Sequence, residues 1–134
     1  MTKILWTSTT ITAPTIVNNG SILSTTGTLQ FVGVGTGNPI AITMGNSSAT
    51  INAQNNSLSF NTSGTPGQLT ITGGVGTIKA NNSVFLNGSS TTAVNVNVGS
   101  ITTTVGTLHF QGNALTLRSL EHWPAFPPVV QLAV

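Results

Sequence analysis

The sequence predicts an all-β protein, and more specifically a parallel β-solenoid (β-helix) of about four coils. Apolar and polar residues alternate with period two in many short segments bounded by Gly, which is typical of half-buried strands. These segments recur as a degenerate three-strand repeat, and none shows a helical period. A jelly-roll or Greek-key β-sandwich is the alternative, because it is also built from short strands with frequent turns.

Each repeat is centred on two apolar residues separated by one position. The first residues of the four pairs are Leu29, Leu58, Val84 and Leu108, at spacings of 29, 26 and 24 residues. An isoleucine precedes each pair by six or seven residues, and another alternating run follows it. Stacked coils place like side chains over one another at the ~4.8 Å strand spacing. We expect a core ladder of Ile22, Leu29, Phe31, Ile51, Leu58, Phe60, Ile78, Val84, Leu86, Ile101, Leu108 and Phe110.

Three regions follow from this pattern. Residues 1–19 form an N-terminal strand arm, residues 20–118 the β-solenoid-like repeat domain, and residues 119–134 a Pro- and aromatic-rich C-terminal arm. The C-terminal arm holds three of the six prolines, so we expect that it cannot continue a strand ladder, because Pro has no N–H to donate. Leu120-Glu121-His122 could alternatively begin a vector-derived extension.

The composition excludes several functional classes. Only 3% of residues are charged and the formal net charge is +2, while Thr, Ser, Asn and Gly make up 66 of the 134 residues. Three basic residues make no basic patch, so we expect no nucleic-acid binding. No stretch of 18 apolar residues is present, so we expect no transmembrane segment. A nearly uncharged surface favours self-association.

The chain lacks the residues that common catalytic and metal sites require. It has no Asp and no Cys, and its single carboxylate, Glu121, cannot form a catalytic pair. We therefore expect no catalytic residues, no metal site, no cofactor and no enzyme activity. His109 stands between two core residues, so alternation places it on the outer face.

Two segments carry a resemblance to a known group of proteins. Gly27-Thr28-Leu29-Gln30-Phe31 and Gly106-Thr107-Leu108-His109-Phe110-Gln111-Gly112, with the Asn-, Thr- and Ser-rich strands between them, resemble the passenger repeats of autotransporters and filamentous haemagglutinin-like adhesins. The resemblance covers about residues 20–118. It implies a β-solenoid at the bacterial cell surface or in secreted form, working in adhesion and self-association. No functional residue of these families maps onto this chain.

The first functional hypothesis is a non-enzymatic structural protein, an extracellular or cell-surface subunit that self-assembles into a filament or surface layer. A short solenoid has two open ends, and we expect no charge to protect them. The partner is then a second copy, a homo-oligomer or polymer joined by end-to-end stacking and terminal arms. The expected self-association interface consists of Ile4, Leu5, Trp6, Trp123, Phe126, Val129, Val130 and Leu132. The alternatives are an adhesin or fibre-tip module that binds a glycan or host surface, and a virion or tail-fibre component.

Overall fold

A computed structural model shows that the chain is an all-β parallel solenoid of about four turns. The structure describes the backbone of residues 3–5, 8–61, 65–119 and 130–133, and the side chains of residues 8–61 and 65–118. Within these residues there are strands, turns and bends but no helix. The predicted fold class is therefore confirmed.

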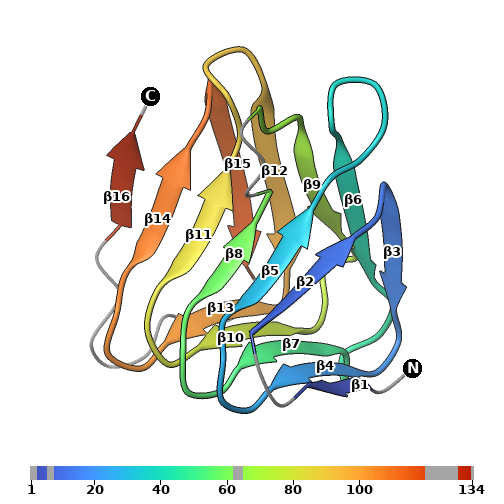
Figure 1. The fold of residues 1–134 in the computed structure, drawn as a ribbon, viewed down its shortest axis with the longest axis vertical. Helices are drawn as coiled ribbons and strands as arrows, with labels where there is room; N and C mark the ends of the chain where they lie inside the picture. Colours follow the sequence, from blue (N-terminus) through green and yellow to red (C-terminus); the bar gives the residue numbers. More distant parts are fainter. Residues whose placement is uncertain (1–2, 6–7, 62–64, 120–129, 134) are drawn as a thin grey trace.

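The described strands follow one another as five triplets and a final single strand (Figure 1). Their bounds are β1 Lys3–Leu5, β2 Thr9–Thr12, β3 Thr15–Asn18; β4 Ser21–Ser24, β5 Leu29–Val32, β6 Ile40–Met44; β7 Thr50–Ala53, β8 Leu58–Phe60, β9 Leu69–Thr72; β10 Thr77–Ala80, β11 Val84–Asn87, β12 Ala93–Val98; β13 Ser100–Thr103, β14 Leu108–Gln111, β15 Ala114–Ser119; and β16 Val130–Ala133.

Within the triplets every third strand belongs to the same sheet, and β16 joins the sheet of β14, which makes three sheets around one core (Figure 1). Sheet A has the order β1-β4-β7-β10-β13, sheet B the order β16-β14-β11-β8-β5-β2, and sheet C the order β15-β12-β9-β6-β3. All neighbouring strands pair in parallel, and equivalent residues of successive triplets lie side by side. The sandwich alternative is wrong, because its sheets are antiparallel.

The inward-facing residues stack into apolar ladders. Ile22, Ile51, Ile78 and Ile101 are register partners in sheet A. All twelve residues of the expected core ladder are buried, the most exposed being Phe110 at 6%. In sheet B the rings of Phe31 and Phe60 stack with centroids 5.0 Å apart. Parallel in-register pairing thus turns a sequence repeat into a continuous apolar interior.

Both flanking regions contribute strands to the sheets. Within residues 1–19, β2 pairs with β5 and β3 pairs with β6, so this region adds a layer to the solenoid. At the other end β16 pairs in parallel with β14. The prediction that the C-terminal region cannot continue the ladder is therefore wrong for residues 130–133. The reason is positional, since the three prolines of this region precede β16 in the sequence and leave its amides free to pair.

Turns at the corners depend on glycine in places where a side chain has no room. Gly73, directly after β9, has φ +122° and its backbone passes so close to β6 that a Cβ would lie 2.1 Å from the Met44 carbonyl oxygen. In the loop before β6, Gly35, Gly37 and Asn38 all have positive φ. This loop thus adds a turn without altering the register of β5 and β6 with their neighbours.

Candidate functional surfaces

The described residues contain no group of three or more His, Cys, Asp or Glu side chains that could hold a metal ion. His109 lies on the outer face of sheet B, as alternation predicts, between buried Leu108 and Phe110. Its ring stacks on Phe85 of the adjacent strand, with centroids 4.5 Å apart, and its Nε2 hydrogen-bonds the Thr107 hydroxyl. These contacts occupy the imidazole with neighbouring side chains of its own coil and of the preceding coil.

The first candidate surface is the pair of open ends of the solenoid. Among the described strands, β1, β2 and β3 are the edge strands at the N-terminal end, and β13, β16 and β15 are the edge strands at the C-terminal end. Edge strands present unpaired backbone groups, which can pair with a strand of another chain. Sheet B extends one strand beyond the other two at the C-terminal end, because β16 covers β14.

The structure describes half of the residues expected in the self-association interface. Ile4 and Leu5 lie on β1, opposite Leu23 and Ser24 of β4. Val130 and Leu132 lie on β16, opposite Leu108 and Phe110 of β14. Ile4 and Leu5 therefore belong to a strand at one end of the solenoid, and Val130 and Leu132 to a strand at the other end. Trp6, Trp123, Phe126 and Val129 lie outside the described residues, and contact of any of the eight with a second copy stays a prediction.

Charge is distributed unequally over the edge strands. Lys3 is on β1 of sheet A and Arg118 is on β15 of sheet C, so each of these sheets has one charged edge. The expectation that no charge protects the ends is therefore wrong for sheets A and C. Both edge strands of sheet B, Thr9–Thr12 and Val130–Ala133, contain no charged residue. Charged residues on edges discourage strand addition, so sheet B is the least protected of the three.

Apolar side chains become more accessible at the N-terminal end. Ile11 of β2 and Ile16 of β3 are only partly buried, whereas their register partners Phe31 and Ile42 are 0% and 1% exposed. Val17 of β3 is 55% exposed. The described part of the chain therefore leaves the first turn of the apolar interior, at the N-terminal end, incompletely covered.

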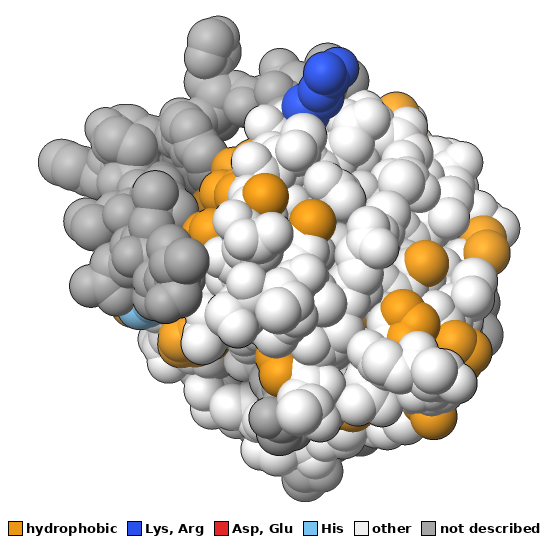
Figure 2. All heavy atoms as spheres, turned by 90° about the horizontal axis from the view of Figure 1, so that it is seen from above, with side chains coloured by type: hydrophobic (Ala, Val, Ile, Leu, Met, Phe, Trp, Pro, Cys, Tyr) orange, Lys and Arg blue, Asp and Glu red, His pale blue; other side chains and the backbone are white. Residues whose placement is uncertain are grey.

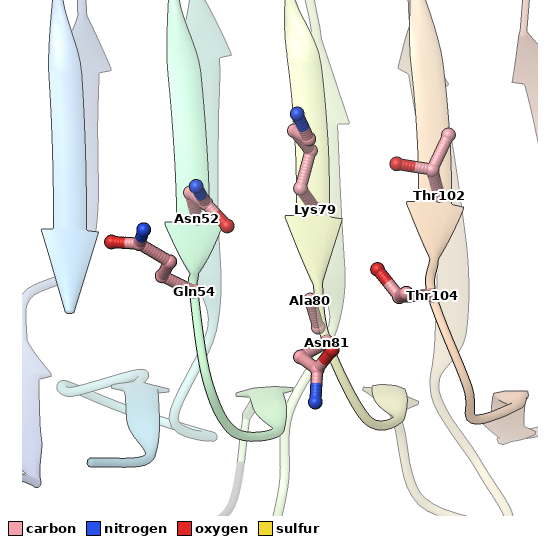
Figure 3. Close-up of a pocket in the computed structure, with 7 residues that line it drawn as sticks. All are labelled: Asn52, Gln54, Lys79, Ala80, Asn81, Thr102 and Thr104. Atoms are coloured by element: carbon pink, nitrogen blue, oxygen red, sulfur yellow. The ribbon is translucent and has the colours of Figure 1, made fainter. Parts of the chain in front are cut away.

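The second candidate surface is a shallow polar depression of about 230 Å³ on the outer face of sheet A (Figure 3). The residues that line it are Asn52, Gln54, Lys79, Ala80, Asn81, Thr102 and Thr104. They come from three neighbouring strands, β7, β10 and β13, and from the residue that directly follows each strand.

The polar side chains of the depression form two rows across these strands. Asn52, Lys79 and Thr102 are register partners and make the first row. Gln54, Asn81 and Thr104 follow two residues later, and their backbone N–H groups still donate to the preceding coil, at 2.9, 3.1 and 3.2 Å. The backbone ladder therefore continues under the second row and fixes its position.

These polar groups keep most of their hydrogen-bonding capacity. Asn81 donates to the Asn82 side chain at 3.0 Å, but the other polar side chains of the depression make no hydrogen bond within the described residues. Elsewhere asparagines are used structurally, as when Asn55 donates to the Thr25 carbonyl. Lys79 is exposed, and the described residues contain no carboxylate to pair with it, since the only acidic residue of the chain is Glu121.

Alternation alone did not single out the depression. It places Asn52, Lys79 and Thr102 outside, between inward residues such as Ile78 and Ala80. Aligning the repeats on their isoleucines would have brought these three positions into one row. The second row could not be predicted in this way, because its residues lie past the strand ends. There the geometry of the corner sets the direction of each side chain.

The face of the molecule drawn in Figure 2 consists mainly of uncharged polar atoms. Figure 2 shows apolar side chains scattered in small groups among uncharged polar atoms, with one basic side chain at the rim. The exposed large apolar residues of the described part are Val17, Val34 and Val105. No described segment is a helix with the length and hydropathy needed to cross a membrane.

No protein-family model, curated protein or solved structure matches this chain at a significant level. The fold implied by the resemblance to autotransporter and haemagglutinin-like repeats is present in the structure.

Proposed function

We propose that this chain is a non-enzymatic structural protein of the cell surface or extracellular space, whose copies join end to end into a filament. The observation that carries this proposal is the character of sheet B. It reaches furthest at the C-terminal end, and both of its edge strands lack charge. The cell-surface setting is supported by the resemblance of the repeats to those of surface adhesins.

The proposed contact between two copies follows from the direction and register of the strands in sheet B. Since all strands of sheet B run parallel, β2 of a second copy can continue the sheet beyond β16 of the first without reversing the molecule. The outer positions Thr10, Gln30, Ser59, Phe85, His109 and Gln131 form one row of register partners. Continuation places Thr10 of the second copy next to Gln131 of the first. Such a head-to-tail contact uses two different surfaces and displaces each copy along the solenoid axis, so it repeats as an open filament.

The backbone of β2 provides the hydrogen-bonding groups for this contact. The N–H groups of Thr9 and Ala13 donate to the Thr28 and Val32 carbonyls of the next coil, at 2.9 and 3.1 Å. Because alternate residues of a parallel strand point to the same side, the N–H groups of Thr10 and Thr12 face away from β5. They are the donors that a strand of another copy would use.

A proline at position 10 tests the proposal. Thr10→Pro removes an outward N–H while leaving the donors to β5 in place, so the solenoid is expected to fold and its self-association to weaken at least tenfold, the loss expected from an edge that can no longer complete its ladder. Analytical ultracentrifugation over a concentration series measures the association, and negative-stain microscopy detects filaments.

Two matched variants give the controls. Thr10→Val keeps the N–H and removes only the hydroxyl that donates to the Gln30 side chain at 3.3 Å. Val17→Pro removes an outward N–H from β3, the uncharged edge of sheet C, since the carbonyls of Pro14 and Asn18 are the ones that face β6. Both are expected to associate as the unmodified chain does. A monomeric unmodified chain, or equal association of Thr10→Pro and Thr10→Val, would overturn the proposal.

A binding role is the second candidate function, and the polar depression on sheet A is the observation that favours it. An adhesin needs a surface with unsatisfied hydrogen-bonding groups, and the outer side chains of β7, β10 and β13 supply them. The two functions are compatible, because sheet A and the edges of sheet B are different surfaces of the column.

A further inference from the structure

The geometry points to the depression on sheet A as a binding site for an acidic saccharide, with a carboxylate or sulfate group held at Lys79. This inference does not depend on the joining of copies through sheet B. It rests on the chemistry of the side chains that line the depression, on their spacing, and on the charge of the described part of the chain.

The lining chemistry matches that of sugar hydroxyls. Asn52 and Gln54 each offer an amide with two donor hydrogens and an acceptor oxygen, and Thr102 and Thr104 each offer a hydroxyl that donates and accepts. Sugar hydroxyls both donate and accept, so they can pair with every one of these groups. The side chains need not break existing contacts, because these four make no hydrogen bond within the described residues.

The spacing favours a chain of sugars over a single small ion. The first row crosses three strands, so its groups recur at the ~4.8 Å strand spacing, a length comparable to one sugar unit of an extended polysaccharide. The second row lies two residues further along the strands, about 6.6 Å away, and can contact the opposite side of the same chain. In Figure 3 Asn52 and Gln54 lie on one side of Lys79 and Asn81, and Thr102 and Thr104 lie on the other side.

The charge of the site selects an acidic ligand. Lys79 stands in the middle of the first row, is exposed, and has no carboxylate partner among the described residues. Its ammonium group is a point charge with three donors, suited to a carboxylate or sulfate. A single cation is too little for a nucleic acid, whose binding requires several neutralised phosphates.

Two other ligand classes fit the site less well. An apolar ligand needs an apolar lining, and among the described residues Ala80 is the only apolar one that contributes to this depression. An extended peptide is bound at the edge of a sheet through backbone hydrogen bonds, whereas Lys79, at the centre of the depression, lies on β10, an interior strand between β7 and β13.

The probe is an oligogalacturonate, and its methyl ester is the matched neutral probe, because the ester keeps the sugar rings and removes the charge. Binding to the full-length chain is measured by isothermal titration calorimetry at low salt. We expect the acidic oligosaccharide to bind and the ester to bind roughly fivefold more weakly, the size of one exposed ion pair. Added inorganic sulfate distinguishes the sources of the anion, since sulfate alone is expected to compete only at much higher concentration than the oligosaccharide.

Substitutions locate the site. Lys79→Gln is expected to weaken binding of the acidic probe about fivefold and to abolish its advantage over the ester. Asn52→Ala is expected to weaken binding of both probes about threefold, as loss of a neutral hydrogen bond does. Arg118→Gln is the control, because it lowers the net charge by the same amount at an exposed residue of sheet C and should leave both affinities unchanged.

Far-ultraviolet circular dichroism checks that each variant folds, and the titrations are repeated with Thr10→Pro. Equal saccharide affinity in that variant would show that binding does not require end-to-end association, so that either proposal can fail alone. Equal binding of acid and ester, equal loss with Lys79→Gln and Arg118→Gln, or sulfate competition as strong as that of the oligosaccharide would overturn the inference.

Discussion

The inner and outer faces of the same strands follow different rules. Inner positions hold mostly isoleucine, leucine, valine and phenylalanine, with one smaller row of Ser24, Ala53, Ala80 and Thr103, and most are completely buried. Outer positions vary more, and no single residue type persists along the row of Gln30, Ser59, Phe85 and His109 or the row of Asn52, Lys79 and Thr102. Stacking therefore keeps most of the interior apolar, while the exterior needs only to avoid repulsion between neighbours.

Hydrogen bonds show the same difference in another form. On the outside, hydroxyls of successive coils pair directly, as when Thr50 donates to Ser21 at 2.9 Å and Ser100 to Thr77 at 3.2 Å. On the inside, a polar group is removed from solvent, so a fixed hydrogen-bond partner within the protein stabilises it. Asn18 has such hydrogen-bond partners, so this polar residue is accommodated in the interior of the solenoid.

Removal of an inward-facing aromatic ring is expected to lower the stability of the protein more than any other change considered. Phe60→Ala deletes a fully buried side chain that stacks on Phe31, and we expect a loss of about 3–5 kcal/mol in the free energy of unfolding. Ser59→Ala, one residue earlier on the outer face of β8, should change stability by less than about 0.5 kcal/mol. Urea unfolding at low protein concentration measures both. A cost for Phe60→Ala no larger than that for Ser59→Ala would contradict the inward assignment.

A smaller effect is expected at the buried asparagine. Asn18 is 1% exposed, and its amide donates to the Thr50 carbonyl at 2.9 Å while its oxygen accepts from the Gly20 N–H at 3.1 Å. Asn18→Ala leaves both groups without this partner, so we expect a loss of about 1–3 kcal/mol. Asn95→Ala on the outer face of β12 is the control and should be nearly neutral. Thermal unfolding of the two variants decides whether the inner amide is structural.

The sequence was sufficient for the solenoid because its repeat and its period-two alternation reflect the same stacking. Ile51 and Ile78 occupy equivalent places in their repeats and are register partners in the structure. The extra strand β16 was missed, since nearby prolines argued against pairing although none lies within Val130–Ala133. The role of edge charges was also missed, because Lys3 and Arg118 become edge residues only through the sheet order.

The depression on sheet A marks another limit of reasoning from sequence. Lys79 was one of four charged residues in the chain, yet nothing local distinguished it from Arg118. Its surroundings are set by Asn52 and Thr102, which lie 27 positions before it and 23 after it. Binding surfaces of a solenoid are assembled across coils, so they emerge only when the register is known.

The most direct test of end-to-end joining is a disulfide between copies, which is clean because the chain has no cysteine. In Thr10→Cys/Gln131→Cys the two positions are five strand steps apart within one chain, about 24 Å, which is too far for a disulfide. If β2 of one copy continues sheet B after β16 of another, they become neighbours across the join, and mild oxidation gives a ladder of covalent multimers on a non-reducing gel. The pair Thr15→Cys/Thr116→Cys in sheet C, held about two strand spacings apart at such a join, stays monomeric. Monomers alone from the sheet B pair, or equal cross-linking of both pairs, would contradict the account.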